Sequence, residues 1–232
     1  NRIGFASFNW MGEEIGLDPN FSPEPHAIHG VGWTSCWDAE RMSEAETVMR
    51  YRHTRDSRWP WSFSATQHIR LDGDRLEITL EAFNLSEEPA PLAFGHHPYF
   101  DQDGAFLQFK AKRVLMNDHM ALPTDMLTPE GVYDFQEGEP VSGKNIDHCF
   151  AQWDGVASIL WPDRPLGLQI ESNMPAAVLY IPRHGESFCF EPVPHINNAL
   201  NRPTDEPAMP TVPPGGTYRS SIILSAVPAQ SL

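Results

Sequence analysis

Residues 76–82 read Leu76-Glu77-Ile78-Thr79-Leu80-Glu81-Ala82, and this stretch indicates the fold class most clearly. Apolar and polar side chains alternate along it, and a period of two is typical of an antiparallel strand with one buried face. Asp72-Gly73-Asp74, directly before it, is typical of a hairpin turn. The sequence therefore predicts a half-buried strand that is entered from a tight turn.

Further segments of the chain have strand character. Residues 178–181 and 188–190 are apolar runs separated by a turn at Gly185, and we expect them to form a hairpin. Residues 218–224 follow the tight turn Pro213-Pro214-Gly215-Gly216 and read as a closing strand. The 22 Pro and 16 Gly residues leave few windows for a long helix. We therefore predict an all-β protein with the architecture of a large antiparallel β-sandwich.

Residues 39–51 are the one fair helix candidate. Ala45, Val48 and Met49 give a weak helical periodicity, but a strand or an irregular loop fits the same residues about equally well. We assign no function to this segment.

The 232 residues are enough for one large domain with a sizeable core, and we expect a single domain over residues 1–232. The Pro-rich stretch 203–214 reads as one long loop inside that domain rather than as a boundary. The chain begins with Asn1 instead of Met, while Ile3 and Phe5 already have strand character. We therefore expect that the domain lacks its N-terminal strands in this sequence.

The charge balance limits the class of partner. Sixteen Lys and Arg residues stand against 31 Asp and Glu residues, which gives a formal net charge of -15. A nucleic acid or an anionic membrane surface would require a basic patch, so we expect neither as a partner. A small uncharged molecule fits this charge more easily than a phosphorylated one.

Cysteine usage and hydropathy indicate the compartment. Cys36, Cys149 and Cys189 are far apart and form no CxxC pair, so their spacing encodes neither a disulfide framework nor a zinc site. No apolar run approaches the roughly 20 residues of a membrane helix, and no leader peptide opens the chain. We expect a soluble, cytoplasmic protein with reduced thiols, either a monomer or a homodimer.

The densest polar cluster is Phe94-Gly95-His96-His97-Pro98-Tyr99-Phe100. Two adjacent histidines suggest a metal site, but neighbours in a strand point to opposite faces, so His96 and His97 are poorly placed to bind one ion. No carboxylate follows at a short spacing. We therefore expect no metal.

Two other segments hold residues that could bind a ligand or transfer a proton. Residues 26–37 contain His29, Gly30, Trp33 and Trp37, and tryptophan faces are surfaces on which sugar rings pack, although tryptophan in a β-protein is more often part of the core. Glu191 follows the apolar run 188–190. Burial would raise the pKa of its carboxyl group toward the range useful to a general base, while a turn residue at a strand end is an equally good interpretation.

These motifs together resemble the aldose 1-epimerase superfamily, also called galactose mutarotase-like, over nearly the whole chain. The matching segments are Asn1-Arg2-Ile3, His29-Gly30, His97-Pro98-Tyr99-Phe100, Asp147-His148 and Glu191-Pro192, in the family's order. His96 stands where the family usually has Asn, and with Pro98 it is a feature of the uncharacterised bacterial branch. The resemblance implies the supersandwich fold, with a sugar in an open cleft.

The resemblance also implies roles. Glu191 would be the general base that takes the proton from the C1 hydroxyl, and His97 the general acid that protonates the ring oxygen. Arg2, His29 and Asp147 would hold sugar hydroxyls or the ring oxygen, and we expect the face of Trp33 to contact the sugar. No metal and no organic cofactor is expected. The activity implied is interconversion of the α and β anomers of a free hexose.

Three alternatives stay open from the sequence. A hexose-6-phosphate 1-epimerase would need basic groups at the rim of the cleft. A non-catalytic carbohydrate-binding domain would most simply lack the acid or the base, and both are present. A glycoside hydrolase would normally need two carboxylates about 5–10 Å apart, and only Glu191 has a distinctive setting.

Overall fold

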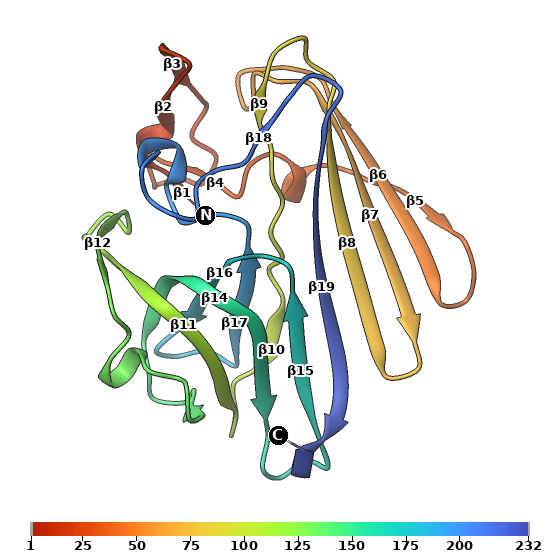
Figure 1. The fold of residues 1–232 in the computed structure, drawn as a ribbon, viewed down its shortest axis with the longest axis vertical. Coiled ribbons are helices and arrows are strands. Elements are labelled where there is room, and N and C mark those ends of the chain that lie inside the picture. The colour runs from red at the N-terminus through yellow and green to blue at the C-terminus, as the bar shows by residue number, and fades with distance from the viewer. Residues whose placement is uncertain (1, 232) are drawn as a thin grey trace.

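A computed structural model of the protein describes residues 2–231, and these residues form strands and short 3₁₀ turns (Figure 1). The strands are β1 (Arg2–Ile3), β2 (Ser7–Trp10), β3 (Glu13–Gly16), β4 (Ala27–Ile28), β5 (Asp38–Arg41), β6 (Glu46–His53), β7 (Phe63–Asp72), β8 (Arg75–Asn84), β9 (Ala90–Pro91), β10 (Tyr99–Asp101), β11 (Phe106–Asn117), β12 (Pro123–Leu127), β13 (Glu139–Pro140), β14 (Ile146–Leu160), β15 (Leu166–Ser172), β16 (Ala176–Ile181), β17 (Ser187–Val193), β18 (Thr211–Val212) and β19 (Thr217–Pro228). The 3₁₀ turns are η1 (Gly4–Ala6), η2 (Gly32–Thr34), η3 (Gly131–Tyr133), η4 (Ala199–Asn201) and η5 (Ala229–Ser231). None of these described turns has the length and apolar character of a membrane-crossing helix.

One 13-stranded antiparallel sheet contains most of the strands, in the order β10-β17-β16-β14-β15-β19-β8-β7-β6-β5, and β11 pairs along β14. The long strand β14 joins two halves of this sheet, because residues 146–151 pair with β16 whereas residues 156–159 pair with β15. The chain bends between these two parts at Gln152 (φ 55°) and Gly155 (φ 90°). A Cβ atom at Gly155 would lie 2.7 Å from the Ser172 carbonyl oxygen, so this bend requires glycine. Figure 1 shows β5–β8 and β19 on one side and β11, β14, β16 and β17 on the other.

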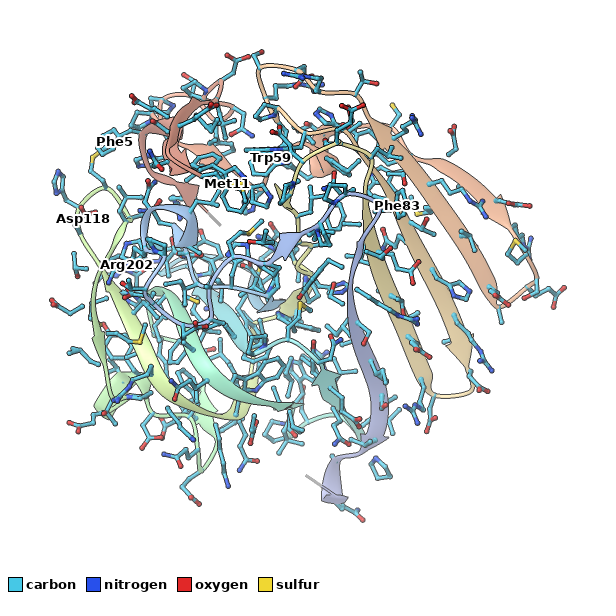
Figure 2. The ribbon with its side chains drawn as sticks, turned by 45° about the horizontal axis from the view of Figure 1, so that its top comes forward. Phe5, Met11, Trp59, Phe83, Asp118 and Arg202 are labelled. Atoms are coloured by element: carbon cyan, nitrogen blue, oxygen red, sulfur yellow. The ribbon has the colours of Figure 1, made fainter. Side chains whose placement is uncertain are left out.

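The main core draws its side chains from both halves of the sheet. Phe109 (β11) contacts Phe150 (β14) and Phe190 (β17) at ring-centroid distances of 5.0 Å each. Ile222 of β19 belongs to the same buried cluster. A second cluster packs the N-terminal segments against β7 and β8, and Figure 2 shows Trp59 of this cluster among the packed side chains. The predicted all-β sandwich is confirmed.

The stretch that indicated the fold forms the middle of β8. Gly73 has φ 63° in the turn between β7 and β8. The two strands pair along their length, beginning at the turn with Asp72 opposite Arg75. Leu80 and Ala82 are buried as expected, but Thr79 on the other face is buried too, with 5% of its surface exposed. The hairpin of β16 and β17 and the closing strand β19 are also confirmed.

The helix candidate at residues 39–51 is wrong as a helix. These residues form β5 and β6, which pair with each other and, through β6, with β7. The helical periodicity of these residues was weak. The eight consecutive residues of β6 that pair with β7 stabilise the strand more than this periodicity favours a helix. The Pro-rich stretch 203–214 is a loop as expected, except that β18 within it pairs with β9.

Candidate active site

Glu191 lies on β17, on the face opposite to the main core. Phe188 and Phe190 point into that core, and alternation along the strand places Cys189 and Glu191 on the other side. Glu191 is nevertheless only 5% exposed, because the segment from β9 to β10 covers it. The backbone N–H of His96 in this segment donates to the Pro192 carbonyl oxygen at 3.0 Å.

Burial is the main reason that the pKa of the Glu191 carboxyl group is raised. The pKa of this group is raised to about 7, mainly by loss of solvation and also by the negative charge of Asp147, while the positive charge of Arg2 opposes the shift. A carboxyl group with this pKa can both accept and release a proton at neutral pH.

His97 contacts this carboxyl group. Its Nε2 lies 3.3 Å from Oε1 of Glu191, and its side chain is 34% exposed, so the imidazole is also open to the cleft. The pairing of β10 with β17, Tyr99 opposite Cys189, fixes the position of the segment. The ring of Tyr99 stacks on His97 at 5.0 Å with an interplanar angle of 16°. Partial burial lowers the pKa of His97.

His29 stands on the other side of His97, at a ring-centroid distance of 5.4 Å. It follows β4, which pairs with β1, and two successive residues with positive φ, His29 (57°) and Gly30 (66°), turn the chain there. The indole of Trp33 lies 5.4 Å from the His29 ring. Loss of solvation, together with the positive charge of Arg2 and His97, lowers the pKa of His29 to about 3, so His29 is neutral.

Arg2 and Asp147 form an ion-paired group beside this cluster. The guanidinium of Arg2 lies 3.1 Å from the Glu24 carboxylate and 3.7 Å from that of Asp147. The Asn117 amide donates to the Asp147 carbonyl oxygen at 2.6 Å, which fixes the start of β14. Asn1, the first residue of the matching motif, lies outside the described residues.

A cavity of about 620 Å³ joins these groups to the other half of the sheet. His29, Trp33, His97 and Glu191 line it, together with residues of β6, β7 and β8. No Lys or Arg occurs among the described residues that line it.

The sequence model of the aldose 1-epimerase family matches residues 1–225. The chain belongs to the aldose 1-epimerase family. Members of this family are isomerases that act on sugars.

Two Escherichia coli K12 proteins are similar to this family member in sequence. One is the uncharacterised protein YphB, 27% identical over 215 residues, which are 88% of this chain and 73% of YphB. The other is an aldose 1-epimerase, 26% identical over 211 residues, or 78% of this chain and 60% of that enzyme.

Solved structures share the fold of this aldose 1-epimerase family member. A galactose mutarotase-like protein from Clostridium acetobutylicum has a TM-score of 0.87 and 19% identity, with 98% of this chain and 77% of that chain covered. A GalM/aldose epimerase homologue from C. elegans has a TM-score of 0.85 and 19% identity, over 98% of this chain and 80% of that chain.

Sequence reasoning missed two polar residues that line the cavity, Gln67 and His195. The alternation of residues 63–69 contained a signal for the first, because Gln67 shares its face with Phe63, Ala65 and Ile69. No such signal existed for His195, which follows β17 in a loop and reaches the cavity only through the fold.

Three side chains at this site could together bind a metal ion, although the sequence predicts no metal. His97, Cys189 and Glu191 each offer a ligand atom within 4.8 Å of the others. Burial raises the pKa of the Cys189 thiol to about 12, so the sulfur is protonated at neutral pH when no metal is bound. His96, by contrast, is buried and separate from this group, with no partner for its Nε2 among the described residues. The absence of a metal stays a prediction.

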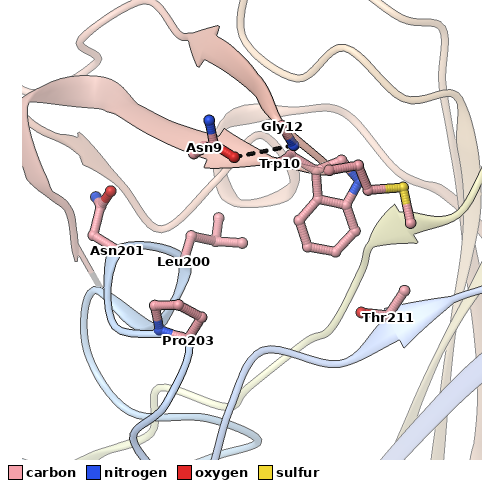
Figure 3. A pocket seen from close by; sticks show the side chains of 8 residues that line it. Asn9, Trp10, Gly12, Leu200, Asn201, Pro203 and Thr211 are labelled. Atoms are coloured by element: carbon pink, nitrogen blue, oxygen red, sulfur yellow. Dashed lines mark hydrogen bonds between the residues drawn. The ribbon is translucent and has the colours of Figure 1, made fainter.

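A second hollow, of about 610 Å³, lies between the β2–β3 turn and η4 (Figure 3). The amide oxygen of Asn9 accepts a hydrogen bond from the Gly12 N–H at 3.1 Å on one wall. The hollow is lined by Asn9, Trp10, Met11, Gly12, Leu200, Asn201, Pro203 and Thr211. None of these side chains titrates near neutral pH, so they offer no group for acid–base chemistry.

Proposed function

We propose that the protein is an aldose 1-epimerase that interconverts the α and β anomers of free, uncharged sugars. The observation that carries this proposal is the 3.3 Å contact between His97 and the buried Glu191 at the cavity. Ring opening requires one proton to leave the C1 hydroxyl and another to reach the ring oxygen. An imidazole and a carboxyl group in contact can serve both oxygens of one sugar carbon.

The reaction balances within this pair. The Glu191 carboxylate accepts the proton of the C1 hydroxyl, and the C1–O bond to the ring oxygen breaks while the carbonyl forms. In the reactive form of the pair, its one proton lies on His97 instead of Glu191, and this imidazolium delivers the proton to the departing ring oxygen. After rotation about C1–C2, closure on the other carbonyl face returns each proton by the same route. No net proton is consumed, and the electron pairs return to their original atoms.

The remaining residues would orient the sugar. Arg2, His29 and Asp147 are proposed to hold hydroxyl groups or the ring oxygen, so that the sugar stays fixed while the C1 end turns. The indole of Trp33 is 50% exposed and offers an apolar face to the C–H groups of the ring.

The cavity supports a free sugar over the alternatives. A phosphorylated hexose would need cationic side chains at the site, and the described lining has neither Lys nor Arg, while Arg2 is paired with two carboxylates. A glycoside hydrolase would need a second carboxylate, and Glu191 is the one carboxylate among the described lining residues. A binding domain would have no need of the contact between His97 and Glu191.

The test is the rate of exchange between the α and β H1 signals of each sugar, measured by NMR with a panel of free hexoses and their 6-phosphates. We expect catalysed exchange for free hexoses and little for the phosphates. Catalysed exchange for the phosphates alone would contradict the choice of a free sugar, and exchange at the buffer rate for every sugar would contradict the activity.

Metal removal gives a second prediction. Because the proposed chemistry uses only the His97 and Glu191 protons, dialysis against EDTA should leave the exchange rate unchanged within error. The measurement is kcat/KM before and after dialysis, with the metal content checked by mass spectrometry. A loss of activity that zinc or another ion restores would show that the His97, Cys189 and Glu191 donor set binds a required metal.

The dependence on pH gives a third prediction. The active pair holds one proton in total, so the rate should fall when the pair gains a second proton and also when it loses the last one. The pKa of His97 is lowered, so the last proton of the pair is held by Glu191. This proton leaves with the Glu191 pKa of about 7. We therefore expect kcat/KM to decline as the pH rises above about 7.

Two variants should move this alkaline decline in opposite directions. Asp147 raises the pKa of Glu191 and Arg2 lowers it, so Asp147→Asn should shift the decline to lower pH and Arg2→Gln to higher pH. Polarimetric rates extrapolated to zero buffer measure both shifts. Shifts of the same sign in the two variants would show that the decline does not report Glu191.

A further inference from the structure

Cys189 lies beside the His97–Glu191 pair but has no part in the proposed proton transfer. It shares with Glu191 the face of β17 that is turned away from the main core, and Tyr99 on the neighbouring strand β10 lies opposite it. The Cys189 sulfur, Nε2 of His97 and a carboxylate oxygen of Glu191 all lie within 4.8 Å of one another. A thiolate, an imidazole and a carboxylate are the donor types that bind zinc in proteins.

The spacing of these three donor atoms is close to that of a zinc site. Zinc bonds of about 2.0–2.3 Å at tetrahedral angles place a nitrogen and an oxygen donor about 3.3 Å apart, and a sulfur donor about 3.6 Å from either. The Nε2 of His97 lies 3.3 Å from Oε1 of Glu191, which matches the first separation. The sulfur would have to approach the other two atoms by about 1 Å at most, and a small side-chain rotation provides this.

The charges around the three donors also suit a doubly charged cation. The Glu191 carboxylate and a Cys189 thiolate would together neutralise Zn²⁺, so the bound group would carry no net charge in a site that is largely shielded from water. Among the described residues that line the cavity there is no Lys or Arg, and Arg2 is already ion-paired with two carboxylates. The Tyr99 hydroxyl donates a hydrogen bond to the sulfur, and such a bond from a neighbouring group stabilises a metal ligand.

We propose that His97, Cys189 and Glu191 form an inhibitory site for zinc and similar thiophilic divalent cations such as cadmium. The ion would take the Nε2 lone pair of His97 and the carboxylate of Glu191, while the Cys189 thiol loses its proton to solvent as the metal–sulfur bond forms. A sugar would then meet neither the acid nor the base, so the inhibition rests on the proposed function. The cation is an inhibitor and not a cofactor, and the metal-free protein keeps its full rate.

The experiment titrates metal-free protein, made without a polyhistidine tag, with zinc chloride and measures anomer exchange of a free hexose. We expect zinc to stop the exchange and magnesium chloride to leave it unchanged, because Mg²⁺ prefers oxygen ligands. Cys189→Ser should raise the zinc concentration at half inhibition by at least about tenfold, since even groups that only support a metal ligand contribute about 10- to 100-fold to affinity. Each rate is compared with the metal-free rate of the same variant.

Cys36→Ser is the matched control. Cys36 is exposed, so this variant removes the same chemical group outside the donor set, and half inhibition should occur at the wild-type zinc concentration. The proposed site would be overturned by a wild type that zinc does not inhibit, by equal inhibition of Cys189→Ser, or by inhibition that disappears in Cys36→Ser.

Cadmium binding gives a readout that does not depend on activity. One equivalent of Cd²⁺ should produce the ultraviolet charge-transfer band of a metal–thiolate bond in the wild type and in Cys36→Ser, but not in Cys189→Ser. Circular dichroism checks that Cys189→Ser is folded, and Cys189→Ala takes its place if it is not. If no sugar is exchanged, the proposed function fails and this band decides the site alone: its loss only in the Cys189 variant supports the site, whereas its persistence there, or its absence from the wild type, overturns it.

Discussion

Replacing Glu191 by glutamine is expected to lower kcat for anomer exchange by about 10²- to 10⁴-fold, the usual contribution of a positioned general base. Glutamine keeps the size of the side chain and a hydrogen-bonding oxygen, but it cannot accept the C1 hydroxyl proton. The effect should appear in kcat more than in KM, because the lost interaction belongs to the transition state. Polarimetry at saturating sugar measures it. Glu186→Gln, an exposed residue just before β17, is the control and should retain wild-type rates.

The same variant should be more stable than the wild type at alkaline pH. The pKa of Glu191 is raised from 4.5 to about 7, so its ionised form costs up to about 3 kcal/mol of folding free energy above pH 7. The penalty grows as the pH rises from 4.5 to 7 and is absent below this window. Urea unfolding should therefore show a gain for Glu191→Gln at pH 8 and little at pH 4. A variant that is both fully active and no more stable would contradict the role and the burial of Glu191.

Replacing His97 by alanine is the second large effect, with an expected loss of about 10²- to 10⁴-fold in kcat. The variant removes the proton donor for the ring oxygen and leaves Glu191 without its contact at 3.3 Å. His97→Gln tests the proton separately, because it can donate a hydrogen bond but cannot transfer a proton at neutral pH, and we expect it to be almost as impaired.

His184→Ala is the control for the histidine variants, because His184 is exposed between β16 and β17. The double variant of His97 and Glu191 should lose little more than either single variant, since the two residues act as one unit. Additive losses in the double variant would show that the two residues act independently, contrary to the proposed shared proton.

Much of the fold could be predicted from local patterns. The alternation of residues 76–82 and the turns at Gly73 and Gly215 identify strands, because they depend only on neighbouring residues. The helix candidate at 39–51 was wrong, since β6 is a strand through its pairing with β7, which lies further along the chain. The need for glycine at position 155 in β14 likewise comes from a distant residue, because a Cβ atom there would meet the Ser172 carbonyl oxygen.

The site was predictable only in part. Motif resemblance pointed to His97, Glu191, His29, Arg2 and Asp147, and the aromatic pattern pointed to Trp33. The structure brings His97, Glu191, His29 and Trp33 to one cavity, whereas Arg2 and Asp147 are not among its lining residues. The contact between His97 and Glu191 joins residues far apart in sequence, through the pairing of β10 with β17. The alternation of residues 63–69 places Gln67 on the same strand face as Phe63 and Ala65, but only the three-dimensional arrangement of the two sheet halves brings that face to the cavity.

Polarimetry of freshly dissolved α-D-galactose and α-D-glucose with the wild type, His97→Ala and Glu191→Gln tests the proposed epimerase activity and both catalytic residues together. We expect a first-order rate well above the buffer blank for the wild type, on at least one of the sugars, and a rate at the blank for either variant. Folded wild-type protein that leaves the blank rate unchanged, or variants as fast as the wild type, would contradict it.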